Sequence, residues 1–147
     1  MEIRLVRENK KEYLDLLLLA DEQESMIDLY LERGDLFALY DEDLKSVCVV
    51  TRESDTVCEL NNIATCEQFH GKGYGKKLLQ HVFSYYRGTY QTMLVGTGDS
   101  PWILRFYEQN GFVISHRKKN FFIDHYDHPM FDNGAQLVDM VYLSKIL

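Results

Sequence analysis

The sequence predicts an α/β (α+β) fold, with a single mixed, mostly antiparallel sheet of about seven strands flanked by about four helices. Two observations lead to this fold class. Segments in which apolar and polar residues alternate are interleaved with segments of helical periodicity. Some predicted strands follow one another directly, as in antiparallel hairpins, whereas others are joined through a helix, as in β–α–β crossovers. A length of 147 residues suits a single domain over 1–147.

The first half of the chain is predicted to form a strand, two helices and three successive strands. Residues 2–7 alternate as a strand does. Residues 10–34 carry two apolar stripes at helical spacing, with a break near 21–24 and Gly34 as the C-terminal stop. Two strands, 35–41 and 45–53, flank a turn, and a third follows at 55–65.

The second half alternates helices and strands. Leu78 to Tyr86 have helical spacing, and 90–98 form a buried strand. A helix over 100–111 begins with Ser100 as N-cap and Pro101 at the first helical position. The rest is predicted as a strand, an irregular loop and a closing strand, over 112–122, 124–134 and 135–146.

Composition excludes several classes of function. A formal charge of −7 disfavours nucleic-acid binding, which needs a basic face. No apolar run approaches the roughly 20 residues of a membrane span, and the alternating N-terminus is unlike a signal peptide. Three cysteines without C-x-x-C spacing argue against a disulfide framework or a structural zinc site, so we expect a cytoplasmic protein. Cys66 lies beside the glycine-rich segment, but no nearby residue is expected to activate its thiol as a nucleophile.

The segment "QFHGKGYGKKLLQHVF" at 68–83 predicts an anion site. Its three glycines, Gly71, Gly73 and Gly75, lie between a predicted strand and a predicted helix, where backbone N–H groups can converge at a helix N-terminus. Three lysines accompany them in an acidic chain: Lys72, Lys76 and Lys77. The alternative is a flexible turn with a solvated basic helix start. Neither the P-loop spacing nor the dinucleotide-binding spacing fits.

Two motifs resemble those of the GNAT superfamily of N-acetyltransferases. "HGKGYG" at 70–75 is similar to its coenzyme-A-binding pattern [Q/R]-x-x-G-x-[G/A], with His70 where Gln or Arg is usual. "FYEQNGF" at 106–112 resembles its downstream helix-to-strand motif. The order of predicted elements also resembles that fold, so the similarity spans nearly the whole chain. Where the family often has an Asn that contacts the pantetheine arm, this chain has Asp99 and Ser100; one of them substitutes, or the contact is absent.

The resemblance implies acetyl-CoA as the acyl donor and assigns residues to it. The resemblance implies that the turn at 70–76 holds the diphosphate and that the strand before it, at 63–65, holds the pantetheine arm. The contact that the family's Asn makes with that arm would come from the start of the helix predicted over 100–111. The implied cofactor-binding residues are Ile63, Ala64, Thr65, His70, Gly71, Lys72, Gly73, Tyr74, Gly75, Lys76, Asp99 and Ser100.

Acetyl transfer to an amine needs a base, an oxyanion donor and an acid for the thiolate. The resemblance implies Tyr107 as the acid, against the alternative of simple core packing, and a backbone N–H near Ile63 or Ala64 as the oxyanion donor. Glu59 is the candidate base, acting through water that Asn61 could order, against the alternative of a solvated strand carboxylate.

We therefore expect an N-acetyltransferase that works by direct attack of a primary amine in a ternary complex. A non-catalytic acyl-CoA sensor is the alternative, and a nucleotide-phosphate binder is a third. The acidic run over 21–32 suggests a cationic amine or peptide acceptor. His125 and His128 are expected to shape the acceptor pocket or a subunit contact, with no metal bound. The sequence leaves the acceptor and a homodimeric state open.

Overall fold

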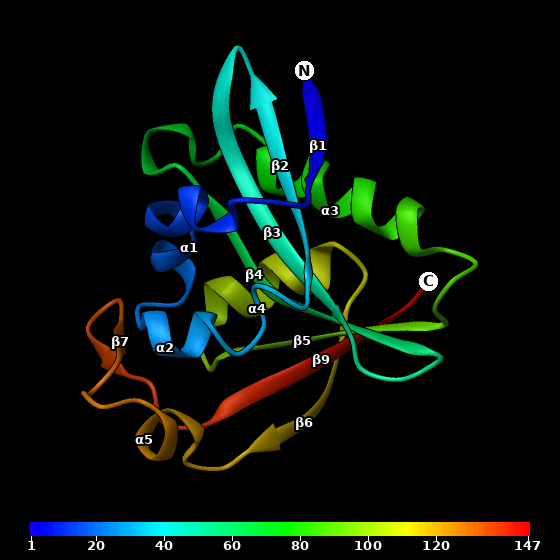
Figure 1. Ribbon diagram of the computed structural model, residues 1–147. Helices are drawn as coiled ribbons and strands as arrows, with labels where there is room; N and C mark the ends of the chain where they lie inside the picture. The colour runs from blue at the N-terminus through cyan, green and yellow to red at the C-terminus, as the bar shows by residue number, and fades with distance from the viewer.

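One seven-stranded sheet, in the order β1-β2-β3-β4-β5-β9-β6, organises the computed structural model, which describes residues 1–147 (Figure 1). Only β4 and β5 pair in parallel; every other pair is antiparallel. The predicted mixed, mostly antiparallel sheet is thus confirmed. Its strands are β1 (Glu2–Val6), β2 (Asp35–Asp41), β3 (Asp43–Arg52), β4 (Val57–Thr65), β5 (Thr92–Gly98), β6 (Val113–Lys118) and β9 (Met140–Ile146).

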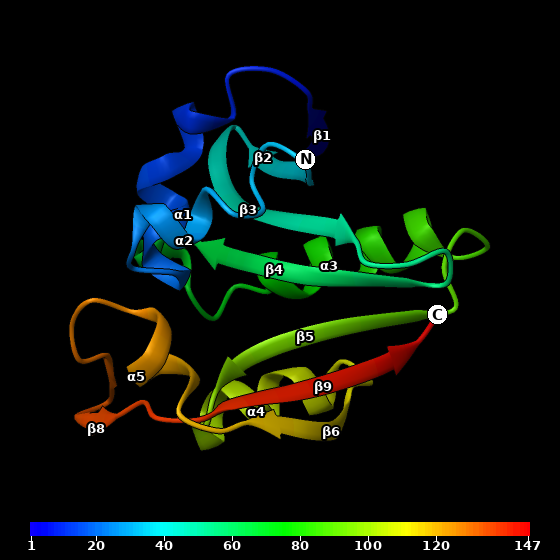
Figure 2. The ribbon, with the colours of Figure 1, turned by 60° about the horizontal axis from the view of Figure 1, so that its bottom comes forward.

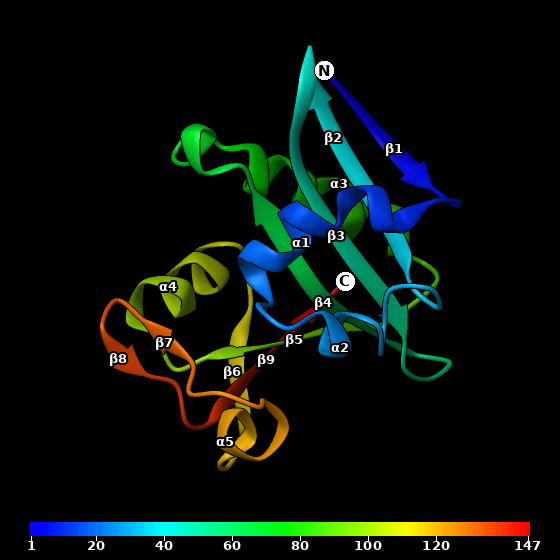
Figure 3. The same cartoon turned by 60° about the vertical axis from the view of Figure 1, so that its left-hand side comes forward.

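Helices cover both faces of this sheet. Figure 3 shows α1 in front of β3 and β4, and α3 behind the sheet. None of the helices is both long and apolar enough to span a bilayer. The helical elements are η1 (Lys10–Tyr13), α1 (Leu14–Ala20), α2 (Glu24–Ile27), η2 (Glu67–Phe69), α3 (Tyr74–Tyr86), α4 (Pro101–Gln109) and α5 (Phe121–His125).

Two hydrophobic cores form because β2 and β3 are apolar on both faces. Phe37 and Cys48 point into the core shared with α3 and α4. Their chain neighbours Leu36 and Val47 point into the core under α1 and α2. Successive side chains of a strand alternate between faces, so a continuous apolar run serves both cores.

The two central strands separate after only four residue pairs. β4 pairs with β5 from Val57 to Leu60 alone, although β4 stays paired with β3 to Thr65 and β5 stays paired with β9 to Gly98. Figure 2 shows the resulting V-shaped divergence of β4 and β5. The backbone groups that would have joined them have no strand partner beyond this point.

A β-bulge at Asn61 accompanies the separation. Leu60 pairs with Val50 and Asn62 with Val49, which leaves Asn61 as the extra residue on β4. A bulge changes which residues share a face. Leu60 accordingly lies in the core under α3, whereas Ala64, an even number of residues later, lies in the core under α1.

The second N-terminal helix is shorter than predicted. α2 ends at Ile27, and turns follow in which Tyr30 and Leu31 remain buried. Gly34 does not adopt the left-handed conformation of a helix stop. It is needed because a Cβ atom there would lie 2.6 Å from Val49 Cγ1 and 2.8 Å from the Tyr30 carbonyl oxygen.

The segment between β6 and β9 also differs from the prediction. The strand expected over 112–122 is wrong beyond Lys118, because Asn120 takes a left-handed conformation (φ 58°) and α5 begins at Phe121. The expected irregular loop contains a short hairpin of β7 (Phe131–Asp132) and β8 (Ala135–Gln136), and the closing strand starts only at Met140.

Replacing Gly34 by alanine should destabilise the fold. The added methyl group meets β3 and the Tyr30 carbonyl, so we expect the free energy of unfolding to fall by about 1–3 kcal/mol in urea titrations. Gly75→Ala is the matched control, because a Cβ atom there would meet nothing closer than 3.6 Å. Equal stability of the two variants would contradict this account of Gly34.

Candidate active site

The turn between β4 and α3 presents a run of free backbone donors. None of the six N–H groups over 71–76 has an acceptor in the protein, and the first hydrogen bond of the helix runs from Lys77 N to Gly73 O at 3.0 Å. Gly71 (φ 78°) and Gly73 (φ 85°) adopt conformations that favour glycine. Together with the N-terminus of α3, these donors form a candidate site for a phosphate or diphosphate.

Gly75 has a different role from the other two glycines. It lies in the first turn of α3 without a positive φ, unlike Gly71 and Gly73. A Cβ atom there would make ordinary contact with Phe106 at 3.6 Å and with Thr65 Oγ1 at 3.7 Å. A small residue at this position therefore lets α3 begin close to the end of β4 and to α4.

Cationic and tyrosine side chains surround the free donors. Lys72, Lys76 and Lys77 are exposed, and none forms an ion pair. Lysines in a first helical turn oppose the helix dipole, so an anion at this end would relieve that repulsion. Tyr74 is held differently: its hydroxyl donates to Asp41 Oδ2 at 2.7 Å, which ties the helix start to the β2–β3 hairpin.

Three contacts anchor the turn to the sheet. His70 Nε2 donates to the Thr65 carbonyl oxygen at 2.9 Å, and Lys45 Nζ lies 3.5 Å from the centroid of the Phe69 ring. The Cys66 thiol donates to the Leu44 carbonyl oxygen at 3.5 Å. His70 thus links the turn to the end of β4 through its side chain, and Cys66 makes a structural contact.

The diverging part of β4 provides main-chain donors beside the turn. Alternate N–H groups along a strand point to opposite edges, so part of the N–H groups over 61–65 face the gap left by β5. Ile63 packs against the core under α3, and Ala64 is buried on the other face. Thr65 Oγ1 lies 3.0 Å from Ser46 Oγ, which fixes the end of the strand.

Tyr107 packs in the core but keeps its hydroxyl free. Its ring makes edge contacts with Phe106 and Phe112, at centroid distances of 5.3 and 5.5 Å. The hydroxyl has no hydrogen-bond partner, yet it is not among the fully enclosed polar atoms that lack one. Burial raises the pKa of Tyr107, so the phenol carries its proton at neutral pH.

Glu59 lies on the opposite face of β4 from Cys58 and Leu60, which belong to the core that contains Tyr107. Its carboxylate accepts no hydrogen bond from a protein side chain. Burial raises the pKa of Glu59, the Glu53 carboxylate raises it further, and Lys118 and Arg33 act in the opposite direction. A carboxylate with a raised pKa is a stronger base than a solvated one.

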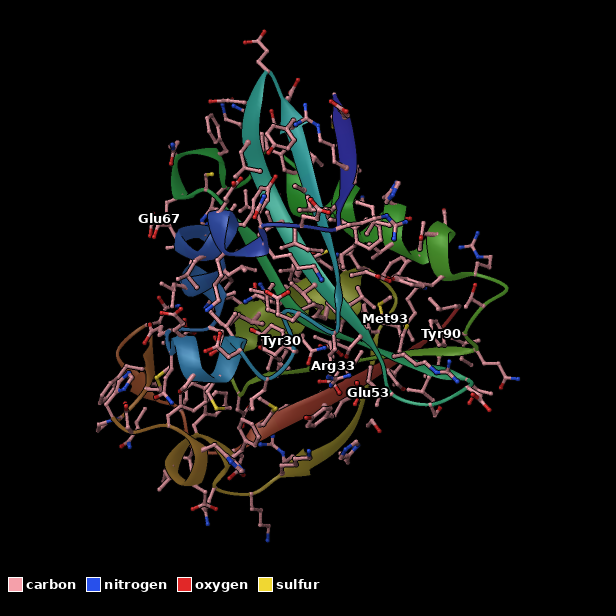
Figure 4. All side chains as sticks on the ribbon, viewed as in Figure 1. Tyr30, Arg33, Glu53, Glu67, Tyr90 and Met93 are labelled. Atoms are coloured by element: carbon pink, nitrogen blue, oxygen red, sulfur yellow. The ribbon has the colours of Figure 1, made fainter.

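The neighbours of Glu59 come from distant parts of the sequence. Arg33 Nη2 donates to Glu53 Oε2 at 3.2 Å, and Figure 4 shows these two side chains together. Asn61 Nδ2 donates to Thr51 Oγ1 at 2.6 Å and to the Glu59 carbonyl oxygen at 3.1 Å, so only its Oδ1 is free to bind a water. Sequence reasoning missed Arg33 and Lys118, since no local pattern relates them to β4.

Asp99 and Ser100 lie where β5 meets α4 and line a cavity of about 390 Å³ that Trp102 and Arg105 also border. Asp99 Oδ2 accepts a hydrogen bond from Arg117 Nη1 at 2.8 Å. Ser100 occupies the N-cap position of α4, but its side chain makes no capping hydrogen bond. The buried Ser100 hydroxyl therefore remains available to a ligand, whereas the Asp99 charge is already paired.

The acidic run is partly neutralised within the protein. Lys11 Nζ contacts Glu24 Oε2 at 2.5 Å and Asp28 Oδ1 at 2.6 Å. Asp21 accepts hydrogen bonds from two tyrosines, described below. Of the acidic side chains in this run, only those of Glu22 and Glu32 have neither an ion-pair nor a hydroxyl partner. Most of the run is therefore engaged within the protein and not free to attract a cationic acceptor.

The two histidines of the 121–129 region have separate contacts. His125 packs on Phe121 at a centroid distance of 4.5 Å, and His128 Nδ1 lies 2.5 Å from Asp127 Oδ1. No group of three or more His, Cys, Asp or Glu side chains is arranged so that it could hold a metal ion.

Residues 32–114 match the family model described as the acetyltransferase (GNAT) domain. The "uncharacterized N-acetyltransferase YvbK" of Bacillus subtilis is 37% identical over 146 residues, which cover 97% of this chain and 94% of that protein.

Solved structures agree with this match over 99% of the chain. A GNAT family acetyltransferase from Elizabethkingia anophelis with acetyl-CoA bound has a TM-score of 0.93 and 34% identity, covering 97% of that chain. A Bacillus subtilis acetyltransferase in complex with CoA has a TM-score of 0.89 and 37% identity, covering 98% of that chain. An "IAA acetyltransferase" from Bacillus cereus has a TM-score of 0.90 and 33% identity, covering 100% of that chain.

Inorganic pyrophosphate should bind at the turn and shift the amide NMR resonances of 71–76. Lys76→Ala should weaken this binding about two- to fivefold, the range expected for losing one exposed ionic contact. Lys119→Ala, in an exposed turn after β6, is the control and should leave the affinity unchanged. Shifts spread evenly over the surface would argue against a localised anion site.

Proposed function

The chain belongs to the GNAT family of acetyltransferases, and we propose that it moves an acetyl group from acetyl-CoA to a primary amine by direct attack in a ternary complex. The run of free N–H groups over 71–76, next to the divergence of β4 from β5, is the observation that carries this proposal. The acetyl-CoA and CoA bound to two solved relatives support the identity of the donor.

The turn and the diverging strand would hold the donor at two points. The N–H groups from Gly71 to Lys76, with the lysine ammonium groups, fit the charge of a diphosphate. The edge of β4 from Ile63 to Thr65 offers main-chain donors and acceptors that suit the amides of a pantetheine arm, and the Ser100 hydroxyl offers one further partner. The thioester supplies an activated acyl group.

Glu59 and Tyr107 would act from opposite faces of the sheet. The amine loses a proton to Glu59, through a water, as its nitrogen forms the new bond to the carbonyl carbon. An N–H of Ile63 or Ala64 stabilises the negative charge that develops on the carbonyl oxygen. As the carbon–sulfur bond breaks, the Tyr107 hydroxyl gives its proton to the thiolate. The opposite placement suits this reaction, because the nucleophile arrives and the thiol leaves at different sides of the carbonyl.

Core packing of Tyr107 is the observation that favours the alternative, a non-catalytic acyl-CoA sensor. Release of thiol from acetyl-CoA across a panel of primary amines separates the two proposals. Tight binding of acetyl-CoA without thiol release for any amine would favour the sensor. Competition by ATP as strong as that by CoA would favour a nucleotide-phosphate binder.

A reducing cytoplasm is the compartment that the cysteines support, since Cys48, Cys58 and Cys66 are all free thiols.

Tyr107→Phe should lower kcat by about 10²–10⁴-fold, the usual contribution of a general acid. The ring and its packing remain, so we expect an unchanged Kd for CoA by calorimetry and little change in Tm. An unchanged kcat would remove Tyr107 from the mechanism.

Glu59→Gln should lower kcat and remove the acidic limb of the pH–rate profile. In the parent protein the base acts only when it is deprotonated. A raised pKa shifts the loss of activity on acidification to a higher pH than for an ordinary glutamate. The profile of kcat/KM between pH 5 and 8 tests this expectation, and an identical acidic limb in the variant would exclude Glu59 as the base.

A further inference from the structure

Four polar side chains form a continuous hydrogen-bonded chain between the segment after α5 and strand β4. Tyr126 donates to Asp21 Oδ1 at 2.7 Å, and Tyr30 donates to Asp21 Oδ2 at 2.9 Å. Asn62 Nδ2 in turn donates to the Tyr30 hydroxyl oxygen at 3.1 Å. We refer to Tyr126, Asp21, Tyr30 and Asn62 as the Asp21 chain. It links residues that lie 105, 9 and 32 positions apart in the sequence.

Tyrosine hydroxyls hold the charge of Asp21 without a cation. No lysine or arginine contacts its carboxylate; the groups facing it are the two tyrosines and, from its own loop, a backbone hydrogen bond at Gln23. Burial raises the pKa of Asp21, and the hydrogen bonds from Tyr126 and Tyr30 oppose that effect. Because each carboxylate oxygen accepts one hydroxyl, losing either tyrosine leaves a largely buried carboxylate oxygen without its partner.

Asn62 joins this chain to the proposed catalytic strand. It directly follows the bulge residue Asn61 and precedes Ile63, whose N–H is a proposed oxyanion donor. Asn62 is 96% buried, and its Nδ2 also donates to the Leu17 carbonyl oxygen at 3.0 Å. Its Oδ1 is enclosed and has no partner. The amide is therefore fixed by its donors alone, two residues beyond the last β4–β5 pair at Leu60.

The Tyr126 end of the Asp21 chain holds the segment 121–138 in place. The Asp127 N–H donates to Gln23 Oε1 at 3.1 Å, next to Asp21 on the α1–α2 connection. The ring of Tyr126 stacks on the buried Phe122 at 5.6 Å, and Phe122 N donates to the Val138 carbonyl oxygen at 3.0 Å. Figure 2 shows α5 and β8 on one side of the opening between β4 and β5, with α1 and α2 on the other.

We propose that Asp21 couples the docking of segment 121–138 on the α1–α2 connection, beside the opening between β4 and β5 (Figure 2), to the geometry of the β4 bulge. When the segment is docked, Tyr126 completes the hydrogen bonding of the Asp21 carboxylate, which in turn fixes Tyr30 and Asn62. Tyr126, Asp21, Tyr30 and Asn62 are thus positioning residues, and the kinetic part of this proposal rests on the proposed acetyl transfer.

Tyrosine-to-phenylalanine variants test this coupling, because they remove one hydroxyl and keep the ring. Tyr126→Phe should raise KM for the amine about tenfold, as expected for losing a hydrogen bond to a charged group. Tyr30→Phe should lower kcat by a similar factor, about tenfold, through the freed Asn62. Neither variant should change the Kd for CoA, since the turn at 71–76 is not part of the Asp21 chain.

Tyr86→Phe is the matched control. The Tyr86 hydroxyl donates to Asp35 Oδ2 at 2.5 Å, which is the same kind of bond, in the core under α3. Its loss should affect Tm but neither KM for the amine nor kcat. In a double-mutant cycle on kcat/KM, the effects of Tyr126→Phe and Tyr30→Phe should not add, because both act through Asp21. Full additivity, or values equal to those of Tyr86→Phe, would overturn the coupling.

Hydrogen exchange gives a readout that does not depend on catalysis. Tyr30→Phe changes no residue of segment 121–138, yet it should speed amide exchange there about tenfold, whereas Tyr86→Phe should not. Unchanged exchange in that segment would overturn the coupling even in an active enzyme. Faster exchange in a protein that acetylates no amine would instead retain the coupling and reject the proposed function.

Discussion

The early separation of β4 from β5 is the constraint on which the site depends. β4 must remain in the sheet through β3, and β5 through β9, while the two strands turn away from each other after Leu60. The bulge at Asn61 makes this possible, because it bends β4 and turns the following side chains to the other face. Main-chain N–H groups of β4 that would otherwise pair with β5 thereby become available for a ligand beside the turn at 71–76.

The two faces of β4 border two chemically different environments. Tyr107 approaches from the apolar core under α3, where burial keeps its phenol protonated. Glu59 lies on the other face, where burial and, to a smaller extent, the Glu53 carboxylate raise its pKa while Lys118 and Arg33 limit the rise. The proposed acid can thus keep its proton, and the proposed base its charge, at one pH because β4 separates their surroundings.

Local patterns predicted most of the architecture, whereas contacts between distant segments could not be predicted. The continuous apolar runs of β2 and β3, the three glycines around the start of α3 and the motif at 106–112 are all properties of short windows. The Tyr126–Asp21 bond and the effect of Lys118 on Glu59 join residues that no window contains. The strand predicted over 112–122 failed for a related reason: Phe121 and Phe122 suit a strand by propensity, but Asn120 turns the chain and Phe122 is buried from a helix instead.

The free N–H groups at 71–76 have a consequence for turnover. They are suited to a diphosphate, which is the portion of acetyl-CoA that the reaction leaves unaltered. They would therefore bind the product CoA as tightly as they bind acetyl-CoA. Contacts at this turn would thus not favour the release of CoA over that of acetyl-CoA. Dissociation of CoA would then limit kcat, and the cellular ratio of acetyl-CoA to CoA would govern the rate of acetylation.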